Sequence, residues 1–194
     1  MRVSIMAFAS TLILFMACRN GASTKNTNNQ SEAAVAMDDS TAIANTLHGF
    51  FTWYDAHVEK LGWTRFVDDS TGDHLTLNDA KLGEYLADLK SSGLVSDELL
   101  EHERSYFKAC ARKWATEDKD EVPSGLSMDR FHCAMDYIAP YPTGKVTSVV
   151  TADRAEAKLT LTGEHGEVFD FKYELKKEGG KWLLSRLGCE TGVE

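Results

Sequence analysis

The side chains with the greatest capacity for chemistry in this 194-residue chain are four cysteine thiols. Cys18 lies between an apolar run and a polar one, and the other three lie far apart along the chain: Cys110, Cys133 and Cys189. His132 directly precedes Cys133, but neighbouring side chains of an extended segment point in opposite directions, so this dipeptide does not predict a nucleophile with its base. The cysteines therefore favour structural or modification roles over catalysis.

The remaining residue types that support catalysis or metal binding are scattered. Six histidines occur singly, without the H-x-x-x-H or C-x-x-C spacing of a zinc site: His48, His57, His74, His102, His132 and His165. The acidic stretch VDDSTGDH, residues 67–74, lacks the residue order of an EF-hand calcium loop and predicts a solvated turn. The stretch EHER, residues 101–104, predicts a solvated helix face with intrahelical ion pairs. No phosphate-binding loop or nucleophile elbow is present, so the sequence predicts no catalytic residue, no metal site and no cofactor.

Composition and charge restrict the class of protein further. Hydrophobic residues make up 43% of the sequence and charged residues 26%, which at this length is typical of one globular domain. Lys and Arg number 21 against 30 Asp and Glu, and no segment concentrates the basic residues. The formal net charge of -9 would repel a phosphate-rich partner, so the sequence argues against nucleic acid as a partner.

The N-terminal segment has the pattern of an export signal. Arg2 is followed by an uncharged, mostly apolar stretch up to Ala17, which is shorter than the roughly 20 apolar residues of a membrane-spanning helix. The end of this stretch, LFMAC, resembles the lipobox of bacterial lipoproteins, although Phe15 and Met16 depart from the usual residues of that motif. The resemblance implies a signal peptide over residues 1–17.

Cys18 would then be lipidated and become the new N-terminus, which anchors the protein in a membrane of the bacterial cell envelope. Residues 18–39 are rich in Asn, Ser, Thr, Gly and Ala and predict a flexible tether. Arg19 is not the acidic residue that retains enterobacterial lipoproteins in the inner membrane, so the resemblance favours the outer membrane, with the domain in the periplasm. An ordinary cleaved signal peptide, giving a secreted or soluble periplasmic protein, and an uncleaved anchor are the alternatives.

The first half of the predicted domain, residues 40–190, has the periodicity of helices. Apolar residues from Ile43 to Leu61 recur at helical spacing, and the aromatic residues of FFTWYDAH within this stretch are expected to be core anchors. Further helices are predicted over residues 77–90 and over residues 97–114, the latter with Ser96 or Asp97 as its N-cap.

After Gly144 the period of the pattern changes to two. Four strands are predicted, joined by short turns that contain Gly or Asp: residues 145–151, 156–162, 168–176 and 181–187. The residues expected to face inward are all apolar or aromatic: Leu159, Leu161, Phe169, Phe171, Tyr173, Leu175 and Trp182. The sequence therefore predicts an α+β domain in which N-terminal helices pack on a C-terminal four-stranded antiparallel meander.

The number of cysteines that could form disulfides is odd. With Cys18 lipidated, three cysteines remain in an oxidising compartment. We expect a disulfide between Cys110 and Cys133, which ties the end of the third helix to the segment after the next loop, and a free thiol at Cys189. Closing a loop of that length is worth roughly 3 kcal/mol in the chain-entropy model. The two other pairings stay open.

The order of these elements resembles that of a known family. FFTWY in the first helix, SYFKAC in the third, the aspartate-bearing turn before IAPYP, and FDFKYELKKEGGKWLLSRL at the end look like an uncharacterised domain of bacterial exported lipoproteins. The similarity runs over residues 42–187 and depends on element order, since no single motif in it is specific. It implies the cone-shaped, cystatin-like fold of nuclear transport factor two, and it carries no activity and no functional residues.

These observations favour an envelope lipoprotein that works as a non-enzymatic binding or accessory module for a small-molecule or protein partner. One alternative is a small enzyme of the isomerase or hydratase kind, because cone-shaped folds also carry such activities. An envelope immunity or inhibitor protein is the other. Polar side chains that converge inside the domain would favour the enzyme, and an apolar interior would disfavour it.

Overall fold

The computed structural model describes residues 28–70, 72–135 and 140–189, without the side chains of residues 28–38 and of residue 63. The predicted signal peptide over residues 1–17, the lipidation at Cys18 and the tether as far as residue 27 lie outside the described residues. Within the part of the chain that is described, no helix is long and apolar enough to span a membrane.

Helix α1 (Asn28–Asp55) begins earlier than the sequence predicted and takes in residues 28–39 of the expected tether. Its apolar stripe is wholly buried: Ile43, Leu47, Phe50, Phe51 and Tyr54. The helix ends at Asp55, where the ring of His57 binds the Trp53 carbonyl (Nδ1 to O, 2.7 Å) and so satisfies one of its last carbonyls. Val58 and Leu61, expected on the helix, therefore lie in the turn that follows it.

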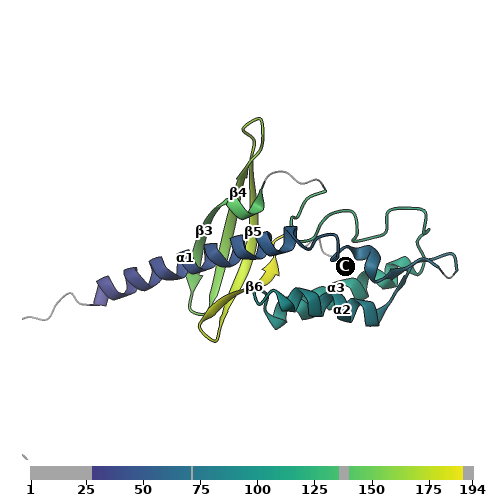
Figure 1. The fold of residues 1–194 in the computed structure, drawn as a ribbon, viewed down its shortest axis with the longest axis horizontal. Coiled ribbons are helices and arrows are strands. Elements are labelled where there is room, and N and C mark those ends of the chain that lie inside the picture. Colours follow the sequence, from purple (N-terminus) through teal and green to yellow (C-terminus); the bar gives the residue numbers. More distant parts are fainter. Residues whose placement is uncertain (1–27, 71, 136–139, 190–194) are drawn as a thin grey trace, which may run out of the picture.

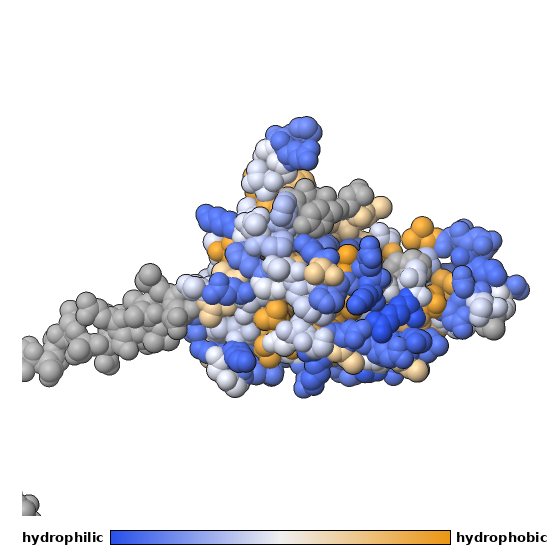
Figure 2. All heavy atoms as spheres, in the orientation of Figure 1, coloured by the Kyte–Doolittle hydropathy of each residue, from blue (hydrophilic) through white to orange (hydrophobic). Residues whose placement is uncertain are grey.

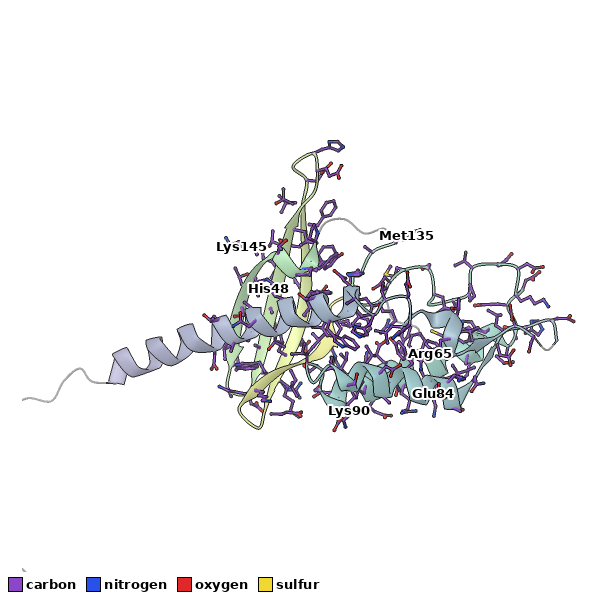
Figure 3. The ribbon with its side chains drawn as sticks, in the orientation of Figure 1. His48, Arg65, Glu84, Lys90, Met135 and Lys145 are labelled. Carbon is purple, nitrogen blue, oxygen red and sulfur yellow. A yellow bond between two sulfur atoms is a disulfide. The ribbon has the colours of Figure 1, made fainter. Side chains whose placement is uncertain are left out.

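A short 3₁₀ helix, η1 (Trp63–Arg65), and a small hairpin of β1 (Val67–Asp68) and β2 (Thr76–Leu77) connect α1 to the next helices. Helices α2 (Asp79–Ser91) and α3 (Asp97–Trp114) confirm the predicted boundaries to within two residues. Asn78 and Ser96 cap them, because each side chain accepts a backbone hydrogen bond from the first turn. Arg65 holds η1 against α2 through ion pairs with Glu84 (3.4 Å) and Asp88 (Figure 3).

After η2 (Tyr141–Thr143), four antiparallel strands form one sheet in the order β3-β4-β5-β6. They are β3 (Lys145–Thr151), β4 (Arg154–Thr162), β5 (Val168–Glu178) and β6 (Lys181–Leu187). Gly179 and Gly180 both have positive φ, 56° and 82°, as a two-residue turn between twisted strands requires. Helices followed by an antiparallel meander confirm the predicted α+β class (Figure 1).

Helix α1 crosses one face of the sheet, and every second residue of β4 is buried beneath it: Ala155, Ala157, Leu159 and Leu161 (Figure 1). The imidazole of His48 on α1 binds the carbonyl of Gly144 (2.8 Å), just before Lys145 starts β3 (Figure 3). Phe169 and Phe171, expected to be inside, are only half-buried, because the β4–β5 hairpin projects beyond α1. On the side of the molecule seen in Figure 2, hydrophobic residues are scattered among hydrophilic ones.

Candidate functional site

The buried ionisable residues Glu103, Arg130 and His132 gather around one loop, Asp129–Ala134, between α3 and η2. A backbone hydrogen bond from Asp129 N to Ala134 O (3.0 Å) closes this loop. Asp129 Oδ1 accepts hydrogen bonds from the backbone N–H groups of Phe131 (2.9 Å) and His132 (2.8 Å), and the Tyr54 hydroxyl donates to Asp129 Oδ2 (2.9 Å). The carboxylate of Asp129 therefore fixes the loop against the end of α1.

His132 lies between two carboxylates. Its Nε2 is 2.9 Å from Asp55 Oδ1, and its Nδ1 is 3.4 Å from Asp129 Oδ1. Burial lowers the pKa of His132, but the hydrogen bonds and charges of Asp129 and Asp55 outweigh it, and the pKa is raised. Burial raises the pKa of Asp129, but its hydrogen bonds to His132 outweigh this effect, and the pKa is lowered. Because both ring nitrogens face acids that hold them, this histidine is poorly placed to act as a general base.

A second buried group, Glu103 with Arg130, lies beside the first. Arg130 Nε is 3.0 Å from both carboxylate oxygens of Glu103, and Nη2 also donates to Oε1. The guanidinium stacks on the Tyr106 ring, 3.4 Å from its centroid. The prediction that residues 101–104 form a solvated face is wrong for Glu103, which is 0% exposed, because it lies one helical turn from both Leu99 and Phe107 on the buried stripe of α3.

The expected disulfide between Cys110 and Cys133 is wrong. Cys133 is bonded to Cys189, two residues after the end of β6, and Cys110 is a buried free thiol. Cys110 lies on the stripe of α3 that packs into the core, whereas the loop Asp129–Ala134 carries Cys133 to the end of the sheet. Cys189, which was expected to be a free thiol, is therefore in the disulfide, and Cys110, which was expected to be in the disulfide, is the free thiol.

A cavity of about 80 Å³ lies next to these polar groups, lined by Tyr54, Tyr85, Asp129, Arg130 and several aromatic rings. Pockets for small-molecule ligands typically measure roughly 300–1,000 Å³, and this volume has room for only a few water molecules. Among the described residues, no three side chains of His, Cys, Asp or Glu are grouped so as to hold a metal ion. The polar interior thus has the features of a structural network that joins the loop to α1 and α3.

A larger concavity lies on the face of the sheet opposite α1, which we call the open face. It measures about 570 Å³, and its lining comes from β3, β4, β5, the last residue of β6 and Gly188. The register Ser148↔Ala157↔Tyr173↔Leu187 runs across its floor, where side chains point to the other face. The concavity is therefore a groove that crosses the strands, and the side chains of the two flanking rows form its walls.

Each wall of the groove has one sign of charge. Lys158 lies directly opposite Lys172 in the β4–β5 ladder, and we call this pair the basic row. Glu156 lies directly opposite Glu174, and this pair is the acidic row. Like charges at directly opposite positions of an antiparallel pair destabilise the sheet. Two such pairs side by side lower the stability of the sheet, and packing of the domain does not require these charges at solvent-facing positions.

The described residues compensate this cost only in part. Glu174 lies directly opposite Arg186 in the β5–β6 ladder, which places a cation beside the acidic row. Lys158 reaches diagonally to Asp170 (3.0 Å), and both side chains are 45% exposed. No acidic side chain of the described residues lies in ion-pair contact with Lys172, and no basic one with Glu156. At one end of the groove, Val149 is 70% exposed. The groove therefore offers separated rows of opposite charge and an apolar contact, which are the elements of a recognition surface.

The sequence reached some of these residues and missed others. The period of two placed Lys158 and Glu156 on the solvent side of β4, but the charge rows depend on the β4–β5 register, which a turn of residues 163–167 sets. For Glu103, the spacing of four from Leu99 and from Phe107 was an available signal. Comparison with known proteins finds no family model, no curated protein and no solved structure that matches the chain.

Proposed function

We propose that this chain is a lipid-anchored protein of the bacterial cell envelope that works as a non-enzymatic binding module. The open face of its sheet is the binding surface. The observation that carries the proposal is the groove of about 570 Å³ between the basic row and the acidic row. A partner with complementary charges relieves the repulsion within each row, so binding returns free energy that the isolated domain loses.

The proposed compartment is supported by two features. Disulfides persist in the periplasm and outside the cell and are rare in the reducing cytosol, and Cys133 is bonded to Cys189. The apolar leader and Cys18 have the pattern of a lipoprotein signal. A Cys18→Ser variant is expected to leave the membrane fraction or to remain an unprocessed precursor, and unchanged membrane partitioning of the processed form would overturn the anchor.

Binding is favoured over catalysis by the state of the groups that could react. His132 is held by two carboxylates, Glu103 is paired with Arg130, and the cavity beside them is small. The two alternative functions predicted from the sequence, a small enzyme and an immunity or inhibitor protein, remain untested predictions. An immunity protein would use the same open face, because a toxin is also a protein partner.

Photo-cross-linking in cells tests the proposal. A photo-reactive amino acid replaces Thr147, which is exposed beside the basic row, or Glu59, which is exposed in the turn after α1. Position 147 is expected to give a discrete cross-linked product on irradiation, and position 59 none. Loss of the product at 147 on reversing the charge of Lys172 would tie it to the groove. The absence of any product from position 147 would overturn the open face as a binding surface.

A further inference from the structure

We propose that the partner on the open face is a second copy of this chain, bound face to face so that the basic row of each copy meets the acidic row of the other. This inference rests on the proposed function, because it uses the same surface. It adds the identity of the occupant and the geometry of the complex.

The arrangement of charge on the open face is ordered in four rows across the strands. Each outward-facing residue along β4 belongs to a different row. Neighbouring rows are about 7 Å apart, because outward residues are separated by twice the rise per residue of a strand. The first row holds Thr160 and Asp170, the second is the basic row, the third is the acidic row, and the fourth holds Arg154 and Lys176. The fourth row is already paired within the chain, because Glu98 of α3 lies 2.9 Å from Arg154 and 4.0 Å from Lys176. On β6 the acidic row continues with Arg186. On β3 the same rows continue with Lys145, Thr147, Val149 and Thr151.

A two-fold axis between the basic row and the acidic row, parallel to both, makes this pattern self-complementary. The axis reverses the strand direction and turns one sheet over onto the other. Lys158 then meets Glu156 of the second copy, and Lys172 meets Glu174 of the second copy. Because a two-fold interface is isologous, the same contacts form in the opposite sense, giving four ion pairs.

The outer rows match under the same operation. Asp170 meets Lys176 of the second copy, which also lies 3.2 Å from Glu178 of its own chain. Arg154, which is paired with Glu98 of its own chain, meets the uncharged Thr160. On β3, Lys145 meets Thr151, and Thr147 meets the exposed Val149. Among these paired positions, no like charge faces a like charge. The central four residues lie nearest the axis, so they stay in register even with the rotation of about 30° between packed sheets.

The size of the face determines the strength of this complex. Four strands spaced about 4.8 Å apart and about eight residues long present roughly 500 Å² per copy, or roughly 1,000 Å² in total. This area is at the lower end of specific interfaces, so the dimer is expected to be weak and sensitive to salt in solution. Tethering both copies to one membrane raises their effective concentration and favours the dimer there.

Sedimentation velocity on the full chain carrying Cys18→Ser, which keeps the lipid off, tests the inference. At about 50 mM salt we expect reversible dimerisation that weakens at about 500 mM salt, where surface charges are screened. The variants K158E/K172E and E156K/E174K place like charges against each other, and each alone should raise the dimer dissociation constant about a hundredfold or more. An equimolar mixture of the two variants should dimerise again, since each then presents the charges that the other lacks.

K60E/K108E is the matched control for K158E/K172E, because it lowers the net charge by the same amount at two exposed lysines away from the sheet. It should dimerise like the parent chain. A parent chain that stays monomeric, a dimer that survives both reversals, or a mixture that fails to dimerise would overturn the second copy as the occupant. The mass of the cross-linked product from position 147 separates the two proposals: twice the chain mass supports the dimer, and any other protein mass overturns the dimer but leaves the binding surface standing.

Discussion

Glu103 on α3 and Arg130 in the loop Asp129–Ala134 form a bidentate ion pair in which neither residue is more than 8% exposed. The pair joins the buried stripe of α3 to a loop that begins 26 residues after Glu103. Removing charges from water is costly, and this cost is offset only while both partners are present. The pair is therefore a device that fixes the position of the loop, and with it the position of Asp129, His132 and Cys133.

Breaking this pair on one side should be strongly destabilising. Arg130→Met leaves the Glu103 carboxylate buried without its cation, and we expect the free energy of unfolding to fall by about 3–5 kcal/mol. The double variant E103L/R130M should recover most of this loss, because neither charge then remains buried. Urea denaturation of the three chains measures both effects. A loss below about 1 kcal/mol in R130M would show that the pair is accessible to water.

The position of His132 predicts a dependence of stability on pH. Its pKa in the folded chain is raised above the unfolded value of about 6.5, so its contribution is fully present below that pH and is lost as the pH rises through the raised pKa. His132→Gln should therefore cost more stability near pH 5.5 than near pH 9, by urea denaturation at each pH. His165→Gln, in an exposed turn, is the control. An equal cost of H132Q at both values would contradict the charged pairing with Asp55 and Asp129.

The disulfide between Cys133 and Cys189 closes a loop of 56 residues. In the chain-entropy model, closure of this length is worth about 4 kcal/mol. Cys189→Ser should lose stability of this order, and a reducing agent should destabilise the parent chain but not this variant. Cys110→Ser should remain sensitive to the reducing agent, because its thiol is outside the disulfide. If C110S rather than C189S became insensitive, the sequence-based pairing would be restored.

Ser185 lies where the register of β5 and β6 shifts, and it is 1% exposed. Its hydroxyl has no hydrogen-bond partner among the described residues. A buried hydroxyl without a partner loses its bond to water, so Ser185→Ala should raise the free energy of unfolding by about 1 kcal/mol. The half-buried Ser148→Ala should change it by less than about 0.5 kcal/mol. Destabilisation of S185A would indicate an ordered water bound at this bulge.

Much of the fold could be predicted because its signals are local. The period of two and the glycine turns defined the sheet, and Ser96 gave the N-cap of α3. The end of α1 was missed because apolar spacing continues to Leu61, which stays buried after the chain has left the helix. Apolar spacing indicates which residues are buried, and a residue can be buried after the helix has ended.

The candidate site depends on relationships between distant residues, which local patterns do not contain. The partner of Cys133 depends on where the loop Asp129–Ala134 meets the end of β6, and the charge rows depend on a strand register. Lys158 and Glu156 read locally as ordinary solvent-facing residues of a strand. The two rows of like charge become visible only when the register places Lys172 opposite Lys158 and Glu174 opposite Glu156.

The most direct test of the open face as a binding surface is the reactivity of its lysines in cells. Intact cells and the purified, dilute chain in high salt are treated with a small amine-acylating reagent, and modification is measured by mass spectrometry. The exposed Lys60 and Lys108 serve as internal references. Occupation of the groove predicts that Lys158 and Lys172 are acylated several-fold less in cells than in the purified chain, relative to these references. Equal relative reactivity in both samples would contradict a partner on the open face.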